Sequence, residues 1–209
     1  MKNFFDEHAA PWEDASGQLH IYALPSESFC ANIEPWRESL CDISGLAQQP
    51  CEYLHLTVQR LPYMLNDKRS EIDSLIRAIQ SEFDEIDSID LQFATPTILD
   101  NSVVLRAEQT SSWETFTDAV RKGIAKVFGE DGLFYEPPAL GAHVTLAYGT
   151  EECDDDTIAM KMSQASMKVR HEEEFLKINL SSIVLVTVHV DVESGVYSFE
   201  KLGEITCRR

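Results

Sequence analysis

Basic residues are scarce in this 209-residue sequence, where 17 Lys and Arg stand against 36 Asp and Glu. The formal net charge of -19 at pH 7 gives a surface that repels phosphate at long range. Broad electrostatic binding to duplex nucleic acid or to an anionic membrane is therefore excluded. Any phosphate ligand must be captured locally by a few side chains.

Paired cysteines and long apolar runs are also lacking. The five cysteines are odd in number, scattered and without Cys-x-x-Cys spacing, which excludes a disulfide framework and a zinc knuckle. The longest apolar segment, 183–190, is too short to span a bilayer and is interrupted by Thr187 and His189. Residues 1–18 show no apolar run beside basic residues, so we expect no secretory signal. These absences predict an unanchored protein of the reducing cytoplasm.

What the sequence does contain is one short pattern in two copies. Leu54-His55-Leu56-Thr57-Val58 returns near the far end of the chain as Ala142-His143-Val144-Thr145-Leu146. In both copies His and Thr alternate with large aliphatic residues, which is the period of a half-buried strand. The ring and the hydroxyl should therefore project from one face of each strand.

Two such strands would bring two imidazoles and two hydroxyls to one site. Histidine titrates near neutrality, so one ring can take a proton from an attacking water while the other protonates the departing oxygen. The hydroxyls can donate hydrogen bonds to non-bridging phosphate oxygens. We therefore predict His55, Thr57, His143 and Thr145 as the catalytic set of a phosphodiester-cleaving site that needs neither a metal nor another cofactor. Which histidine is the acid stays open.

The rest of the chain alternates strands with amphipathic helices. A strand is expected over 19–24, with His20 and Tyr22 on the face opposite Leu19 and Ile21. A helix is expected from Pro35 through Ile43, and a longer helix over 72–86. The segments 89–99 and 102–107 read as a hairpin, followed by a helix from a Ser111/Glu114 capping box to Gly129. Asp154 to Asp156 suit the start of a helix through Met162, as partners of its dipole rather than as metal ligands. Strands should follow over 175–180, 182–191 and 196–202.

This order lacks long parallel crossovers, so the fold class is α+β. The two motif strands, each with an amphipathic helix nearby, suggest a bilobal, pseudo-two-fold arrangement of two antiparallel sheets flanked by helices, with the active cleft between them. We expect residues 1–17 to form a weakly ordered arm and residues 18–209 to form one bilobal domain. A monomer is expected.

From about Leu19 to Leu202 the chain resembles the 2H phosphoesterase superfamily, the LigT-like proteins that include RNA 2′,3′-cyclic phosphodiesterases once called 2′-5′ RNA ligases. The resemblance is carried by His55-Leu56-Thr57-Val58 and His143-Val144-Thr145-Leu146, with Leu24-Pro25 and Ile183 to Val186 as wider features. It implies a metal-independent phosphodiesterase acting on 2′,3′-cyclic or 2′-5′ bonds of a small nucleotide or an RNA end.

Two positions depart from that resemblance. Family members often carry a basic residue shortly after each motif, but Gln59 holds the face-sharing position after the first. Tyr148 stands where an arginine is common after the second. Strand alternation predicts that Arg60 points away from His55. We therefore expect the hydroxyls to bind the phosphate and assign Gln59, Tyr148 and Tyr22 to substrate binding, with Tyr148 or Tyr22 as a stacking surface for a base.

Other readings of these residues stay open. His20 and His189 also fall on expected strands, and without a partner motif each is interpreted as a structural histidine. From another functional class, the chain could be a binding module that keeps the cleft and recognises a nucleotide or a protein without turnover. The intact His and Thr in both copies favour the enzyme, and the absent basic residues favour the module.

Overall fold

The computed structural model describes residues 1–8, 15–169 and 176–208. Its strands are β1 (Gln18–Ala23), β2 (Leu46–Gln48), β3 (Leu56–Met64), β4 (Ile89–Gln92), β5 (Thr97–Ile98), β6 (Ser102–Arg106), β7 (His143–Gly149), β8 (Lys177–Leu180), β9 (Ser182–Asp191) and β10 (Val196–Thr206). Its helices are α1 (Phe4–His8), α2 (Glu27–Leu40), α3 (Leu65–Lys68), α4 (Ile72–Phe83), α5 (Ser111–Phe128) and α6 (Asp155–Ser166), with short 3-10 turns η1 (Cys51–Tyr53), η2 (Arg69–Glu71) and η3 (Gly129–Leu133).

Two four-stranded antiparallel sheets form the body of the molecule. The first sheet has the order β10-β9-β1-β3, and the second has the order β2-β7-β6-β5. The first motif therefore lies at the edge of one sheet, while the second motif lies in the interior of the other. Together with the helices, these sheets confirm the predicted α+β class with two antiparallel sheets.

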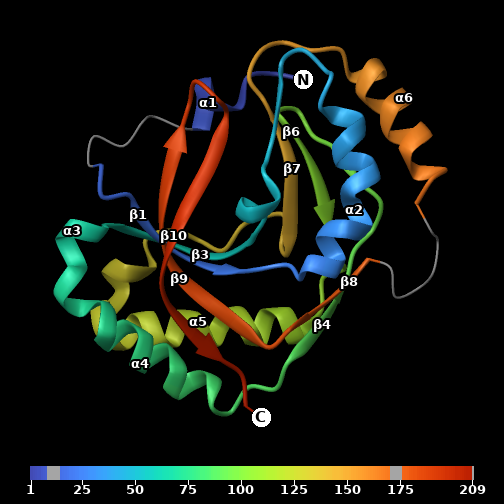
Figure 1. Cartoon of the computed structure of the whole chain (residues 1–209). Helices are drawn as coiled ribbons and strands as arrows, with labels where there is room; N and C mark the ends of the chain where they lie inside the picture. The colour runs from blue at the N-terminus through green and yellow to red at the C-terminus, as the bar shows by residue number, and fades with distance from the viewer. Residues whose placement is uncertain (9–14, 170–175, 209) are drawn as a thin grey trace.

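The helices pack in two pairs. α4 packs against α5, and this pair contacts β10 and β3 of the first sheet (Figure 1). α2 packs against α6, and α2 also contacts β2 and β7 of the second sheet. Each sheet thus buries one face in the apolar core and keeps its other face for the His and Thr side chains.

The first sheet shows this division along β1. Leu19, Ile21 and Ala23 belong to the main hydrophobic core, whereas Tyr22 belongs to a separate cluster with Val186 and Phe199. His20 and Tyr22 therefore share the face opposite Leu19 and Ile21, as the alternation predicted.

Two predicted elements differ clearly from the observed ones. The expected hairpin arm 89–99 is split: β4 pairs with β8, and only Thr97–Ile98 pairs with β6. Pro96 lies in this break, where a residue without an N–H cannot donate to a sheet ladder. α2 begins at Glu27 rather than near Pro35, because Ser26 caps it by accepting a hydrogen bond from the Phe29 N–H.

The cap of α5 is displaced by one residue. Thr110, rather than Ser111, is the N-cap and accepts from the Trp113 N–H at 3.2 Å. The predicted end of this helix at Gly129 is confirmed, with φ at 63°. At α6 the acidic run acts as expected for a helix start, since the Asp154 side chain accepts from the Thr157 and Asp156 N–H groups.

The N-terminal segment 1–8 packs on the body. Its short helix α1 places Phe4 4.4 Å from the Tyr148 ring and Phe5 6.1 Å from the Tyr197 ring, both centroid to centroid. The remainder of the expected arm includes 9–14, which lies outside the described residues, as does Phe175 at the start of one expected strand. Phe4 and Phe5 thus pack against the rings of Tyr148 on β7 and Tyr197 on β10.

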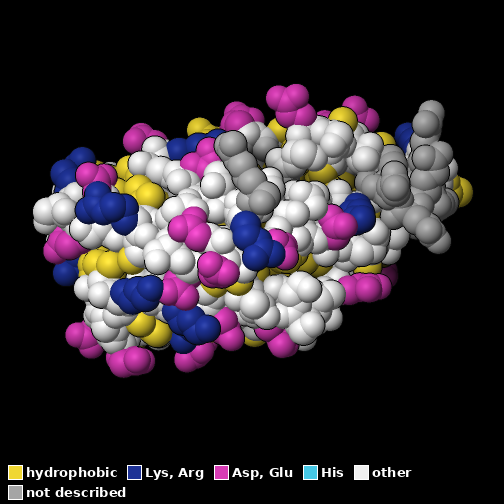
Figure 2. Space-filling model, turned by 90° about the horizontal axis from the view of Figure 1, so that it is seen from below, with side chains coloured by type: hydrophobic (Ala, Val, Ile, Leu, Met, Phe, Trp, Pro, Cys, Tyr) yellow, Lys and Arg dark blue, Asp and Glu magenta, His cyan; other side chains and the backbone are white. Residues whose placement is uncertain are grey.

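The surface seen from below carries interspersed acidic and basic side chains without a continuous basic area (Figure 2). This distribution agrees with the excess of acidic residues in the sequence. Within the part of the chain that the structure describes, no helix combines the length and the apolar character needed to cross a bilayer.

Candidate active site

A β-bulge interrupts each motif strand directly after its His-x-Thr. In the first sheet Ile21 pairs with Gln59 and Tyr22 with Thr57, so Val58 is an extra residue on β3. In the second sheet Val103 pairs with Ala147 and Val104 with Thr145, so Leu146 is extra on β7. A bulge of this kind shifts the alternation of side chains. Arg60 after the first motif and Tyr148 after the second therefore join the His-x-Thr face.

The first histidine is held on three sides. His55 Nδ1–H donates to the Tyr53 carbonyl at 2.7 Å. The Tyr22 ring stacks on its imidazole with centroids 3.9 Å apart and planes within 9°, and the Phe199 ring meets it edge-on at 5.9 Å. His55 stays partly exposed. Its free Nε2 is therefore the atom available to a ligand.

A chain of hydrogen bonds through Gln18 and His20 fixes the hydroxyl end of the Tyr22 ring. Gln18 Nε2 donates to the Leu61 carbonyl at 2.8 Å, which turns the Gln18 amide oxygen toward His20 Nε2 at 3.2 Å. His20 Nε2 therefore carries a hydrogen, and the Tyr22 hydroxyl donates to His20 Nδ1 at 2.9 Å. Thr57 also forms a side-chain hydrogen bond with the Tyr22 hydroxyl. The structural role predicted for His20 thus consists of anchoring Tyr22.

The second histidine repeats the arrangement of the first. His143 Nδ1–H donates to the Gly141 carbonyl at 2.9 Å, again two residues upstream. Thr145 forms a side-chain hydrogen bond with Tyr148, as Thr57 does with Tyr22. Gly141 adopts a φ of 66° before the strand, in the left-handed region that favours glycine. The same tautomer, with Nε2 free, therefore results in both motifs.

The two motifs meet although they belong to different sheets. β3 approaches β7, and the charge of His143 contributes to lowering the pKa of His55. Burial is the main cause that lowers the pKa of His55, to about 4, against the opposing effect of the Tyr53 carbonyl. Burial also lowers the pKa of His143, with a further contribution from Arg106. Both rings therefore favour the neutral form near pH 7 in the absence of a ligand.

Three residues predicted to bind substrate have other contacts. Gln59 is completely buried, because the bulge turns it to the core side, where its amide bonds the Tyr135 carbonyl at 2.7 Å and Arg121 at 3.0 Å. Tyr22 is 1% exposed beneath His55, and Tyr148 is 9% exposed beneath α1. Neither tyrosine presents an open ring face for a base, in contrast to the stacking role expected from the resemblance.

Two arginines that the sequence analysis did not include in the site lie beside the motif residues. Arg60 was expected to point away from His55, but the bulge turns it to the same face. Burial is the main cause that lowers the pKa of His20, and the nearby charge of Arg60 lowers it further. Its guanidinium also lies over the Tyr135 ring at 5.0 Å. Arg106 is the cross-strand partner of His143. Arg106 falls within the predicted strand 102–107, but the register in which this strand pairs with the His143 strand could not be read from the sequence.

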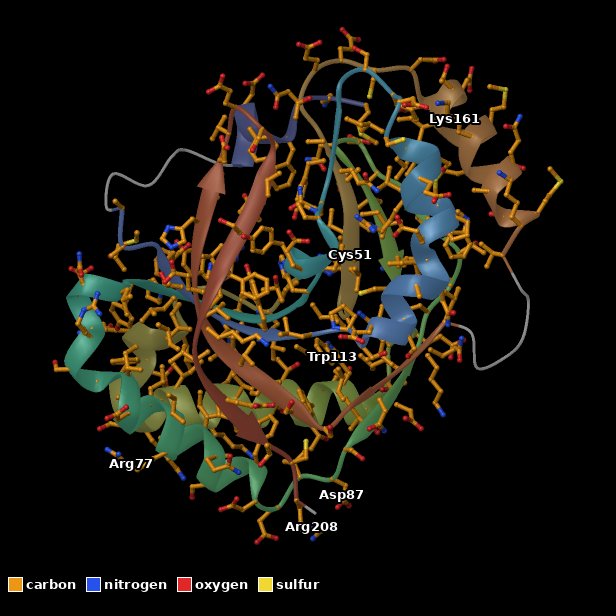
Figure 3. All side chains as sticks on the ribbon, in the orientation of Figure 1. Cys51, Arg77, Asp87, Trp113, Lys161 and Arg208 are labelled. Carbon is orange, nitrogen blue, oxygen red and sulfur yellow. The ribbon has the colours of Figure 1, made fainter. Side chains whose placement is uncertain are left out.

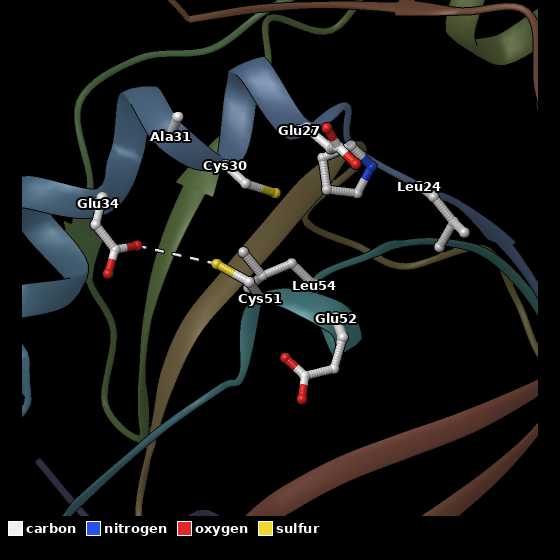
Figure 4. A pocket seen from close by; sticks show the side chains of 9 residues that line it. Leu24, Glu27, Cys30, Ala31, Glu34, Cys51, Glu52 and Leu54 are labelled. Carbon is white, nitrogen blue, oxygen red and sulfur yellow. Dashed lines mark hydrogen bonds between the residues drawn. The ribbon is translucent and has the colours of Figure 1, made fainter.

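A cavity of about 510 Å³ lies beside the first motif, between α2 and η1. Its lining includes Leu24, Cys30, Glu34, Cys51 and Leu54 (Figure 4). The Cys51 thiol lies 3.9 Å from a Glu34 carboxylate oxygen and 2.6 Å from Arg37 Nη1. Neither motif histidine lines this cavity, so we do not assign it to the same site.

Comparison with solved structures identifies the fold. TT0787 of Thermus thermophilus matches with a TM-score of 0.69 at 14% identity, over 91% of this chain and 98% of that protein. E. coli LigT in its apo form matches with a TM-score of 0.63 at 12% identity, over 92% and 98% of the two chains. A phosphoesterase matches with a TM-score of 0.62 at 15% identity, over 92% and 99%.

Comparison at the level of sequence gives no match. No family model matches it, and no curated protein matches it. The likeness in shape to LigT and TT0787 spans nearly the whole length of the chain, so the chain has a LigT-like fold. At identities of 12% to 15% this likeness establishes the fold alone.

Proposed function

We propose that the protein is a phosphodiesterase that cleaves 2′,3′-cyclic or 2′-5′ phosphodiester bonds in a small nucleotide or at an RNA end. One observation carries the proposal: both motif histidines are held through Nδ1 by the carbonyl two residues upstream. This arrangement leaves two free Nε2 atoms, and the charge of one ring influences the protonation of the other. Paired imidazoles of this kind suit general acid–base catalysis.

The different surroundings of the two rings suggest their roles. His55, with a pKa lowered to about 4, is neutral at physiological pH and suits the general base. Its Nε2 would take a proton from water as the new O–P bond forms. His143 would then give its Nε2 proton to the ribose oxygen as the old P–O bond breaks. A bound phosphate raises the pKa of His143 by its negative charge, which would charge this ring when the substrate is present.

The threonines and Arg60 complete the proposed site. Thr57 and Thr145 are partly exposed beside their histidines, and on ligand binding their hydroxyls would turn from the oxygens of Tyr22 and Tyr148 to donate to the non-bridging oxygens. Arg60 is exposed on the same face and supplies positive charge from the first motif. No step of this mechanism is routed through a metal or another cofactor.

The substrate class is supported by charge and by the structural neighbours. E. coli LigT has been solved with 3′-AMP, with ATP and with NADP+, which are all small nucleotides. The net charge of -19 disfavours a long RNA, because most of the surface would repel its backbone. A small or terminal phosphodiester therefore fits best. A cytoplasmic location and a monomeric state stay predictions from the sequence.

One feature favours the alternative of a binding module without turnover. Tyr148 joins the His143 face after the bulge and is covered by Phe4 and Phe5. The Tyr148 position itself therefore offers neither a cation nor an open ring. The alternative keeps the same nucleotide-sized ligands but expects no product.

The deciding experiment is incubation in EDTA with 2′,3′-cyclic nucleotides, cyclic dinucleotides and 2′-5′ oligoadenylate, beside the His55→Ala/His143→Ala variant. Turnover by the wild type, lost in the variant, supports the phosphodiesterase. Single His→Ala changes should each lower the rate by about 10²- to 10⁴-fold. If neither protein forms product but both are stabilised by a nucleotide, the binding module replaces the enzyme. His189→Ala, on β9, is a matched control that should keep wild-type turnover.

A further inference from the structure

Arg106 lies directly beside the second motif. It is the cross-strand partner of His143 in the β6–β7 ladder, and direct partners in an antiparallel pair project from the same face. The side chain is exposed, and its charge reaches the His143 ring, where it contributes to a lowered pKa. The guanidinium is therefore next to the reacting imidazole, although helix α5 and the loop after it separate the two residues in the sequence.

Arg106 also has no carboxylate partner among the residues that the structure describes. Arg37, Arg121 and Arg208 each pair with a carboxylate, whereas Arg60, Arg69 and Arg77 share with Arg106 the lack of such a pair within the described part of the chain. Of these four unpaired arginines, Arg106 is the one whose cross-strand partner is a motif histidine. An arginine left unpaired beside a histidine disfavours protonation of that histidine until an anion arrives. The arrangement is thus suited to a ligand that brings negative charge.

The position that could otherwise supply a cation to this motif does not do so. The bulge in β7 turns Tyr148 to the His143 face, but Tyr148 is uncharged and buried under α1. At the equivalent position of the first motif the chain has Arg60, exposed on its face. The first half thus carries its cation on the motif strand itself, and the second half carries it on the neighbouring strand.

We propose that Arg106 binds a non-bridging phosphate oxygen of the ligand beside His143, and thereby makes protonation of His143 depend on phosphate binding. This inference rests on the proposed function for its substrate, a phosphodiester. A planar guanidinium can bind phosphate through two parallel N–H groups, which a lysine ammonium cannot do. The phosphate held there offsets the charge of Arg106, so His143 gains a proton when the ligand arrives.

The test compares Arg106→Gln and Arg106→Lys with Arg77→Gln. Arg77 is exposed on α4, at the outer edge of the molecule (Figure 3). Inorganic phosphate is titrated into each protein while the ring resonances of His143 are followed by NMR across pH. Arg106 on β6 and His55, the residue before β3, both carry charge that acts on or responds to His143, so His55 is followed in the same spectra.

Arg106→Gln should weaken phosphate binding by about 10- to 100-fold, as expected for a charge-assisted hydrogen bond. It should also raise the pKa of His143 in the free protein and remove its further rise on adding phosphate. Arg106→Lys should restore part of the binding, and Arg77→Gln should behave as wild type. With a 2′,3′-cyclic nucleotide, Arg106→Gln should raise KM more than it lowers kcat.

Three results would overturn the inference: phosphate binding unchanged in Arg106→Gln, an equal loss in Arg77→Gln, or no phosphate binding by the wild type. The first of these, with turnover intact, leaves the proposed phosphodiesterase standing. Arg106-dependent phosphate binding without turnover of any substrate instead removes the proposed enzyme and keeps the anion site. The two proposals can therefore fail separately.

Discussion

The Tyr22 ring lies flat against the His55 imidazole, with centroids 3.9 Å apart and planes within 9°. This stack joins a strand of the first sheet to the first motif, and hydrogen bonds from Tyr22 to His20 and from His20 to Gln18 hold the ring in place. It is a relationship that no short motif in the sequence displays.

The stack predicts different outcomes for two changes at Tyr22. Tyr22→Phe keeps the ring and should leave kcat within a few-fold of wild type. Tyr22→Leu removes the stacked face and lets water reach His55, so the pKa of His55 should rise from about 4 toward 6.5. We expect kcat to fall by at least about 10-fold. The acid limb of the kcat/KM profile should move up in pH, and an unmoved limb would contradict the role of the stack.

The wild-type pH profile should have its optimum on the acidic side of pH 7. The base His55 must be neutral, so kcat/KM falls as pH drops through about 4. The acid His143 must be protonated, so kcat/KM also falls as pH rises through its pKa, which burial holds below 6.5. Initial rates at low substrate concentration, measured from about pH 3.5 to about pH 8, cover both limbs. An optimum clearly above neutral pH would exclude this assignment of acid and base.

The threonines should contribute through their hydroxyls. Thr145→Val keeps the size and the strand preference of the side chain but removes its donor, and should lower kcat by about 10²-fold. Thr145→Ser keeps the hydroxyl and should retain most of the activity. Thr57→Val and Thr57→Ser form the matched pair in the first motif. Thermal unfolding of each variant separates a loss of donor from a loss of fold, and equal activity of the Val and Ser variants would rule out hydroxyl donation.

Stability should decline as pH falls below about 6.5. Burial lowers the pKa of His20, His55 and His143, so each binds a proton more weakly in the folded chain than in the unfolded one. The unfolded state therefore gains protons first as the pH falls. Between its pKa in the unfolded chain and its pKa in the folded chain, each histidine lowers the free energy of unfolding by up to about 1.4 kcal/mol for each pH unit of that fall. Above that pH this contribution is constant.

His20 tests that linkage because its role is structural. His20→Gln removes one titrating group, so denaturant unfolding between about pH 7 and about pH 5 should show a shallower dependence on pH than the wild type. Its stability at neutral pH should be lower, since the Tyr22 hydroxyl loses its acceptor. A pH dependence identical to that of the wild type would show that His20 does not titrate in this range.

The sequence predicted the structure well where the periodicity of apolar residues was regular. The alternation around His55 and His143 predicted which side chains share a face, and the helices of 72–86 and 111–129 followed their apolar periodicity closely. The core side of β1 was predicted correctly for the same reason. Periodicity reports burial, and burial was regular in these segments.

The sequence was uninformative where pairing between distant strands decides the geometry. The extra residues Val58 and Leu146 look like ordinary strand residues, and only the partner strands reveal them as bulges. This is why Arg60 and Gln59 exchanged their predicted faces. The pairing of β4 with β8, and the register of Arg106 with His143, likewise depend on contacts far apart in the chain.

The two bulges make the site sensitive to chain length rather than to composition. Replacing Val58 or Leu146 by another aliphatic residue would leave Arg60 and Tyr148 where they are. Deleting either residue would restore a regular ladder and turn every following side chain of that strand to the opposite face. A deletion scan should therefore find these two plain aliphatic residues as intolerant as the histidines, although neither touches a ligand.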